Sequence, residues 1–226
     1  MLTRVLATAS RSLRLTRNAV RHQSASASSP GVVELREYVL KPEFIGEYMK
    51  ISTEGGDLRK RLVPLRLFGN PETGDTLNLA QHFYHYSDLT ERQEARDAAQ
   101  VDPDWQEYIG AIRPHVAVQK STIYVEAPFV YEGSLELSGM SEEFVHSDGD
   151  KPGVYELRRF RVNPGGGSVL AFLDMFEDAA KLEVQNAADG SALKTVLVSE
   201  VGDGSEVGSH QNLLTAFMLP HSCCRC

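Results

Sequence analysis

Stretches of alternating hydrophobic and polar residues recur along this chain, and turn residues or helical spacing follow each of them. The alternation predicts four strands in the first half, over residues 32–40, 65–69, 77–86 and 119–127. Apolar residues at helical spacing predict helices after Pro42, from Asp88 to about Gln100, and over Trp105–Ile112, the first of them kinking or ending at Gly55-Gly56. The resulting order, βαββαβ, is that of the ferredoxin-like unit, a four-stranded antiparallel sheet with both helices on one face.

The same order begins a second time. Glu34-Leu35-Arg36 recurs as Glu156-Leu157-Arg158 at an offset of 122, and the segment that begins with Asn78-Leu79 is echoed by Asn212-Leu213 at an offset of 134. We expect strands over residues 154–162, 193–201 and 212–219 and a helix over residues 168–182. The second copy then breaks off without its second helix and fourth strand, which favours a truncated or mis-spliced gene model. The predicted fold class is therefore α+β, with tandem ferredoxin-like domains of which the second is incomplete.

These patterns divide the chain into four expected segments. A leader over residues 1–30 precedes a first domain over residues 31–128. An acidic linker over residues 129–152 joins this domain to the partial second domain over residues 153–226. Aromatic residues in the linker, including Phe129 and Phe144, predict that it packs in part.

The leader differs in charge from the rest of the chain. No acidic residue precedes Glu34, whereas the same stretch holds five arginines, in a protein whose net charge is −8. On a helical wheel the leucines and valines gather opposite most of these arginines. An Arg-rich, acid-free amphipathic N-terminus is typical of a mitochondrial transit peptide, and a solvated basic tail is the alternative. We expect residues 1–30 to be disordered, to direct import and to be removed.

Composition narrows the function classes. The acidic balance argues against a general nucleic-acid binder. No apolar run reaches the roughly 18 residues that a membrane span needs. The three cysteines, Cys223, Cys224 and Cys226, lie close together at the C-terminal end, so they cannot form a disulfide framework for the rest of the protein. His82 and His85 point to opposite faces of one strand, and no metal or cofactor motif stands out, so we expect neither a metal site nor a cofactor.

Part of the chain resembles the NIPSNAP family. The resemblance is carried by the opening Glu34-Leu35-Arg36 with Tyr38, the strand from Asn78 to Tyr86, Arg92 and Arg96, and the segment Asp102-Pro103-Asp104-Trp105 with Tyr108. It covers residues 31–128 well and residues 153–219 in part. It implies tandem domains of the dimeric α+β-barrel type, a mitochondrial location in the matrix, and no established enzymatic activity. The chain departs from the family where its second copy breaks off, and in having Tyr84 where many relatives carry tryptophan.

Strand parity sorts the polar side chains by face. Val33 and Leu35 share one face of the first strand, and we expect the apolar faces to pack on the helices. The opposite faces of the first and third strands carry the ligand-pocket candidates Glu34, Arg36, Tyr38, Asn78, His82, Tyr84 and Tyr86. Inside a barrel these groups could satisfy one another as a structural network. Alternatively they form a pocket for an anionic or carbonyl ligand, with Arg36 as charged donor and His82 as acid or base.

Arg92 and Arg96 lie one helical turn apart and are the candidates for a partner-binding surface, with a solvated helix face as the plainer interpretation. Two classes of function follow. The favoured one is a non-catalytic mitochondrial protein that acts by protein–protein interaction, in quality control or trafficking as the resemblance implies. The alternative is a small ferredoxin-like barrel enzyme of monooxygenase or isomerase type. Protein partners are expected, and a homo-oligomer remains open.

Overall fold

The computed structural model describes residues 30–74, 76–133, 135, 137, 139–141, 154–162, 168–186, 192–201 and 211–219. The predictions for the leader over residues 1–29, for Phe144 in the linker and for the cysteine-rich end lie outside these residues.

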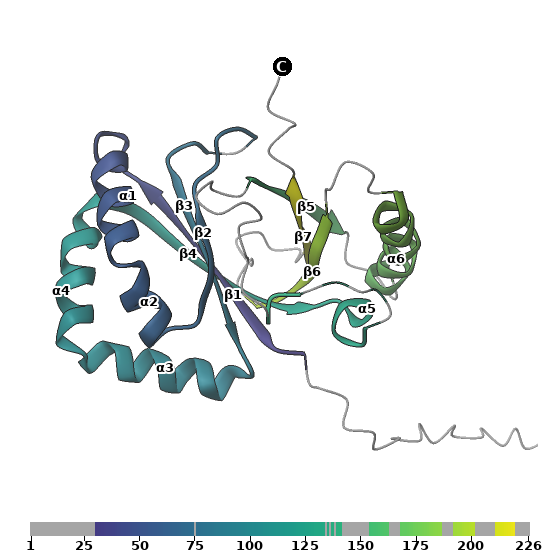
Figure 1. Ribbon diagram of the computed structural model, residues 1–226, viewed down its shortest axis with the longest axis horizontal. Helices are drawn as coiled ribbons and strands as arrows, with labels where there is room; N and C mark the ends of the chain where they lie inside the picture. The colour runs from purple at the N-terminus through teal and green to yellow at the C-terminus, as the bar shows by residue number, and fades with distance from the viewer. Residues whose placement is uncertain are drawn as a thin grey trace, which may run out of the picture.

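Among the described residues, seven strands form one curled antiparallel sheet in the order β2-β3-β1-β4-β6-β7-β5 (Figure 1). The strands are β1 (Val32–Leu40), β2 (Leu65–Gly69), β3 (Leu79–Tyr86), β4 (Val116–Glu126), β5 (Val154–Val162), β6 (Ala192–Val201) and β7 (Gln211–Leu219). In the first half, β1 pairs with β3 on one side and with β4 on the other, and Glu34 stands opposite Tyr84 and Ile123. This is the strand order of a ferredoxin-like unit, so the predicted α+β ferredoxin-like fold is confirmed.

Helices cover the outside of this sheet (Figure 1). In this view α1, α2, α3 and α4 lie on one side of β1–β4, and α6 stands beside β5–β7. The helical segments are η1 (Pro42–Phe44), α1 (Ile45–Glu54), α2 (Gly56–Leu62), α3 (Leu89–Val101), α4 (Pro103–Ile112), η2 (Arg113–His115), α5 (Pro128–Tyr131) and α6 (Ser168–Asn186). None of the described helices is both long and apolar enough to cross a membrane.

Local chemistry fixes where these helices begin and end. The Asp88 carboxylate accepts hydrogen bonds from the backbone N–H groups of Thr90, at 2.7 Å, and Glu91, at 2.8 Å. These bonds cap α3, as the sequence predicts. The helix after Pro42 breaks between α1 and α2 at Gly55, where a Cβ atom would lie 2.4 Å from the ring of Tyr108. Only glycine therefore lets the backbone of this junction approach α4 so closely.

The two halves of the chain are joined through β4 and β6. Their register places Glu126 opposite Leu197. Thr195 Oγ1 donates a hydrogen bond to the buried Glu126 carboxylate over 3.0 Å, and the Met140 backbone N–H donates to the same oxygen over 2.5 Å. Phe129 is buried in α5, so the segment after β4 packs in part, as expected. One sheet runs through both halves of the chain. The division into separate domains stays a prediction.

The expected assignment of the sheet faces is wrong. The polar and aromatic face of β1 and β3 packs against the helices, where Tyr38 and Tyr84 share a buried cluster with Trp105. The apolar face points to the inside of the curled sheet. There its residues form a cluster that spans both halves, made of Val33, Leu35, Phe83, Tyr124, Met140 and Leu197. The reason is that both faces are covered, so polarity alone does not identify the layer that covers each face.

Candidate functional site

A cluster of charged side chains around Glu34 occupies the space between the sheet and α3. Glu34 lies on β1, and none of its surface is exposed. Its Oε1 accepts hydrogen bonds from Arg36 Nε at 2.9 Å and from Arg92 Nη2 at 2.8 Å. Arg96 Nη2 donates to Oε2 at 2.6 Å, and Ser121 Oγ on β4 donates to Oε1 at 2.7 Å. Both oxygens of the carboxylate are therefore engaged from three directions.

The arginines keep Glu34 ionised. Burial on its own raises the pKa of a carboxyl group. Here the hydrogen bond from Arg92 and the charges of Arg96 and Arg36 outweigh burial and hold the pKa of Glu34 well below its usual range. One carboxylate thus faces three guanidinium groups, and the cluster carries excess positive charge.

His82 on β3 lies in the middle of the aromatic packing beneath α1. Its exposed fraction is 0%, and its Nε2 lies 3.2 Å from the hydroxyl of Tyr48. The ring of Phe68 stacks on the imidazole with a centroid distance of 4.9 Å. Burial, followed by the charge of Arg59, lowers the pKa of His82 well below its ordinary value. The imidazole is consequently neutral at physiological pH and shielded from solvent.

Arg59 on α2 is a buried cation, and no pattern in the sequence singles it out. It is 2% exposed, although it lies in the charged stretch Asp57–Arg61. Its Nε donates to the Tyr108 hydroxyl at 2.6 Å, and its Nη1 donates to the Tyr84 hydroxyl. Its guanidinium carbon lies 5.0 Å from the centroid of the Tyr108 ring, within reach of a cation–π interaction. Within the described part of the chain, no carboxylate forms an ion pair with it.

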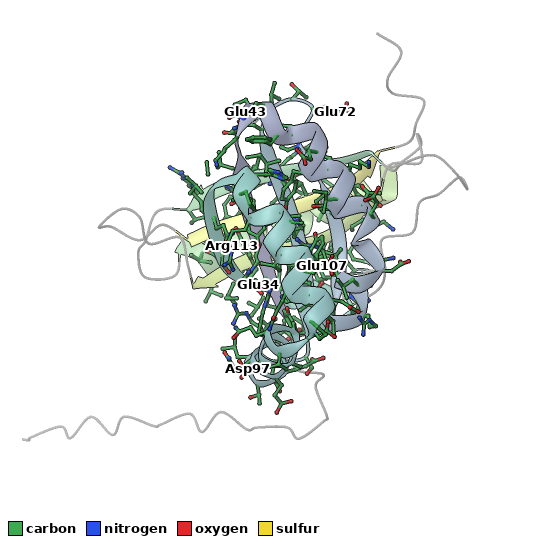
Figure 2. The ribbon with its side chains drawn as sticks, turned by 90° about the vertical axis from the view of Figure 1, so that its left-hand side faces the viewer. Glu34, Glu43, Glu72, Asp97, Glu107 and Arg113 are labelled. Carbon is green, nitrogen blue, oxygen red and sulfur yellow. The ribbon has the colours of Figure 1, made fainter. Side chains whose placement is uncertain are left out.

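A cavity of about 170 Å³ adjoins Arg36 and Arg96 of the Glu34 cluster and also the buried Arg59. It lies between β1 and β4 on one side and α3 and α4 on the other, with Arg59 reaching it from α2. Its lining combines guanidinium, amide, aromatic and apolar groups, from Arg36, Tyr38, Arg59, Arg96, Ala99, Gln100, Trp105, Ile109, Arg113 and Gln119. Figure 2 looks onto this helical layer and labels Glu34 and Arg113 on the same side of α4.

The fold and this cluster coincide with a known domain. The NIPSNAP family model matches residues 33–130, the stretch that runs from the second residue of β1 through β4 and includes α1 to α4. The human protein NipSnap homolog 3A is 30% identical over 154 residues, which are 67% of this chain and 55% of that protein. The chain belongs to the NIPSNAP family. It spans about half the length of the curated relatives that it matches.

Solved structures of bacterial NIPSNAP proteins are also similar to part of this chain. An uncharacterized NIPSNAP domain protein from Burkholderia xenovorans is 28% identical, with a TM-score of 0.41, over 43% of this chain and 96% of that one. A NIPSNAP family protein of unknown function from Agrobacterium tumefaciens is 28% identical, with a TM-score of 0.42, over 44% of this chain and 90% of that one.

Within the NIPSNAP domain, most of the predicted pocket candidates do come together. Arg36 Nη1 donates to the Tyr38 hydroxyl at 3.3 Å, and Tyr84 meets Arg59. Tyr86 is buried in the same aromatic cluster. Asn78 stands apart just before β3, where its side-chain amide donates to the Leu40 carbonyl at 2.5 Å. The group lies on the helix side of the sheet rather than inside the curl.

The expectation of a solvated helix face for Arg92 and Arg96 is wrong. Both side chains turn toward the sheet and bind Glu34, and only 22% and 12% of their side-chain surface is exposed. A partner-binding role for them remains a prediction. Among the described residues, no group of three His, Cys, Asp or Glu side chains is placed to hold a metal ion.

Proposed function

We propose that this NIPSNAP protein enters the mitochondrial matrix and acts there by binding other proteins rather than by catalysis. Mitochondrial quality control or trafficking is the setting that the family resemblance implies. Import is supported by the five arginines and the absence of acids before Glu34.

The burial and the lowered pKa values of Glu34 and His82 support a role without catalysis. A general acid or base must reach its substrate and change protonation near the working pH. Glu34 is fully buried and its pKa is held low by three arginines. His82 is fully buried and its pKa is held low by its surroundings. Neither group meets these conditions, so both serve the fold.

The inside of the curled sheet supports the same conclusion. Val33 and Leu35 from the first half meet Leu197 from the second in a buried apolar cluster. Side chains therefore fill the space in which a barrel enzyme would hold its substrate. This leaves the outer surface for contact with partners.

Import is tested with residues 1–30 fused to a fluorescent reporter. We expect a mitochondrial signal, and we expect it to be lost when Arg4, Arg11 and Arg14 are replaced by glutamate, because the positive face drives import. A diffuse cytosolic signal from the unmodified fusion would contradict the proposal.

Partner binding is tested by cross-linking in isolated mitochondria, followed by reconstitution with the purified partner. The control variant is His82→Phe, which preserves an aromatic ring at the buried position but removes any acid–base chemistry. We expect the folded variant to keep the partner affinity of the wild type. Failure of the intact chain to cross-link to any protein, or loss of function in a folded His82→Phe variant, would count against a non-catalytic binding role.

A further inference from the structure

The cavity beside α4 has an unbalanced charge. Among the described residues that line it, four are arginines and none is acidic. Arg36 and Arg96 share Glu34, which already accepts hydrogen bonds on both oxygens. Arg59 and Arg113 form no ion pair within the described part of the chain. A negative charge in the cavity would therefore meet four guanidinium groups. The Glu34 carboxylate neutralises only part of their positive charge.

Two of these guanidinium groups hold buried N–H donors without an acceptor. Within the described residues, Nη2 of Arg59 and Nε of Arg96 have no hydrogen-bond partner. Buried polar groups in proteins are nearly always hydrogen-bonded, and a buried charge without a counter-charge is destabilising. Arg59 is 2% exposed, so bulk water does not satisfy its donor.

The remaining lining sets the size and character of an occupant. At about 170 Å³ the cavity is smaller than the roughly 300–1,000 Å³ typical of drug-sized ligands. Trp105 and Ile109 of α4 supply an aromatic and an apolar wall. Gln100 and Gln119 supply amide groups. Arg113 is exposed, so solvent reaches the cavity on the side where Arg113 lies.

We propose that this cavity binds a small organic anion that carries a carboxylate or phosphate head group on a short apolar body. The head group accepts hydrogen bonds from Arg59 and Arg96, since planar guanidinium groups match both kinds of oxyanion. Arg113 closes the site on the solvent side, and the apolar body lies against Trp105. This site goes beyond the proposed protein-binding role, and it requires neither catalysis nor mitochondrial import.

The test is isothermal titration calorimetry of the purified full chain at neutral pH and constant ionic strength. The probes are phenyl phosphate, benzoate, inorganic phosphate and the neutral analogue phenol. We expect at least one of the two aromatic anions to bind with one-to-one stoichiometry and more tightly than inorganic phosphate, and we expect phenol not to bind. The preferred aromatic anion then distinguishes a phosphate from a carboxylate head group.

Two charge-matched pairs of variants locate the site. Arg113→Gln should weaken binding about tenfold, equivalent to about 1.4 kcal/mol, whereas Arg61→Gln, which removes an exposed arginine outside the lining, should not. Arg59→Gln should weaken binding at least as much, with exposed Lys60→Gln as its control on the same helix. If Arg59→Gln fails to fold, the pair at Arg113 and Arg61 decides the question.

Three results would overturn the proposal. The first is the absence of binding heat for both aromatic anions on a folded chain at millimolar concentration. The second is equal weakening by Arg113→Gln and Arg61→Gln, which would show attraction to general surface charge. The third combines two observations: inorganic phosphate binds as tightly as phenyl phosphate, and within each pair the control variant weakens binding as much as the lining variant. This result would indicate an adventitious ion only.

Discussion

Replacing Glu34 with glutamine removes the carboxylate that Arg36, Arg92 and Arg96 share. The substitution preserves the size of the side chain and an oxygen acceptor, so its main effect is the loss of one negative charge. Breaking a buried ion pair by removing one partner costs about 3–5 kcal/mol, because the remaining charges stay buried without compensation. The arginine side chains are 25%, 22% and 12% exposed, and this partial hydration moves the expected loss toward the lower limit, about 3 kcal/mol.

The measurement is urea unfolding of the full chain followed by tryptophan fluorescence. The protein contains one tryptophan, Trp105, which is 8% exposed in the helical layer over β1. Its emission therefore reports on the half of the protein that contains Glu34. A loss of about 3 kcal/mol is large against the roughly 5–15 kcal/mol that stabilise a typical domain. In a chain of this length it should lower the melting temperature by about 6–12 °C.

The matched control is Glu107→Gln, which removes an exposed carboxylate from α4 that forms no ion pair within the described residues (Figure 2). Surface substitutions of this kind change stability by about 0.5 kcal/mol or less. If the unfolding free energy of Glu34→Gln also stays within about 0.5 kcal/mol of the wild type, the cluster does not anchor the domain and the reasoning from its geometry is refuted.

Further predictions follow from the same contacts. Because the folded pKa of Glu34 is depressed, its contribution to stability is present above the unfolded value of about 4.3 and is lost as the pH falls below it, so acid titration of unfolding should be steeper in the wild type than in Glu34→Gln. Gly55→Ala should destabilise by about 1–3 kcal/mol because its methyl group meets a buried ring, whereas Gly110→Ala, which meets nothing within 4 Å, should be neutral or stabilising in the same melts. Residues 153–226 expressed alone should aggregate, since β6 pairs with β4, while residues 31–128 should fold; a cooperative melt and a monodisperse size-exclusion peak for residues 153–226 would contradict this.

The elements themselves could be predicted from local pattern. The strands over residues 32–40, 65–69 and 154–162 have the bounds that alternation predicts, and Asp88 caps α3 as its position suggests. These features depend on side-chain parity, turn chemistry and capping, all of which act within a few residues. The fourth strand begins three residues earlier than expected, at Val116, because β1 pairs with it as far as Leu40. That extension depends on a neighbouring strand rather than on the local sequence.

Arg59 shows what local pattern cannot supply. Its neighbours Lys60 and Arg61 are exposed, and three consecutive basic residues ordinarily predict a solvated helix face. Arg59 is buried because the break at Gly55 turns α2 toward Tyr108 and Tyr84, whose hydroxyl groups accept its hydrogen bonds. Those partners lie 49 and 25 residues away along the chain. Only the packed helices bring them together, so the cavity that Arg59 lines was not predicted either.

The sequence does contain a signal for the observed assignment of the two sheet faces, which strand parity alone does not show. Arg92 and Arg96 are like charges one turn apart, a pair that destabilises an isolated helix. Such a pair is stable when one anion binds both, and in this fold the face of β1 that α3 covers carries Glu34. An acidic residue on that face therefore requires the polar side of the strand to lie under the helix, which leaves Val33 and Leu35 for the inside of the curl. Charge pairing between elements therefore indicates which layer covers each face, where alternation of hydrophobic residues alone led to the wrong assignment.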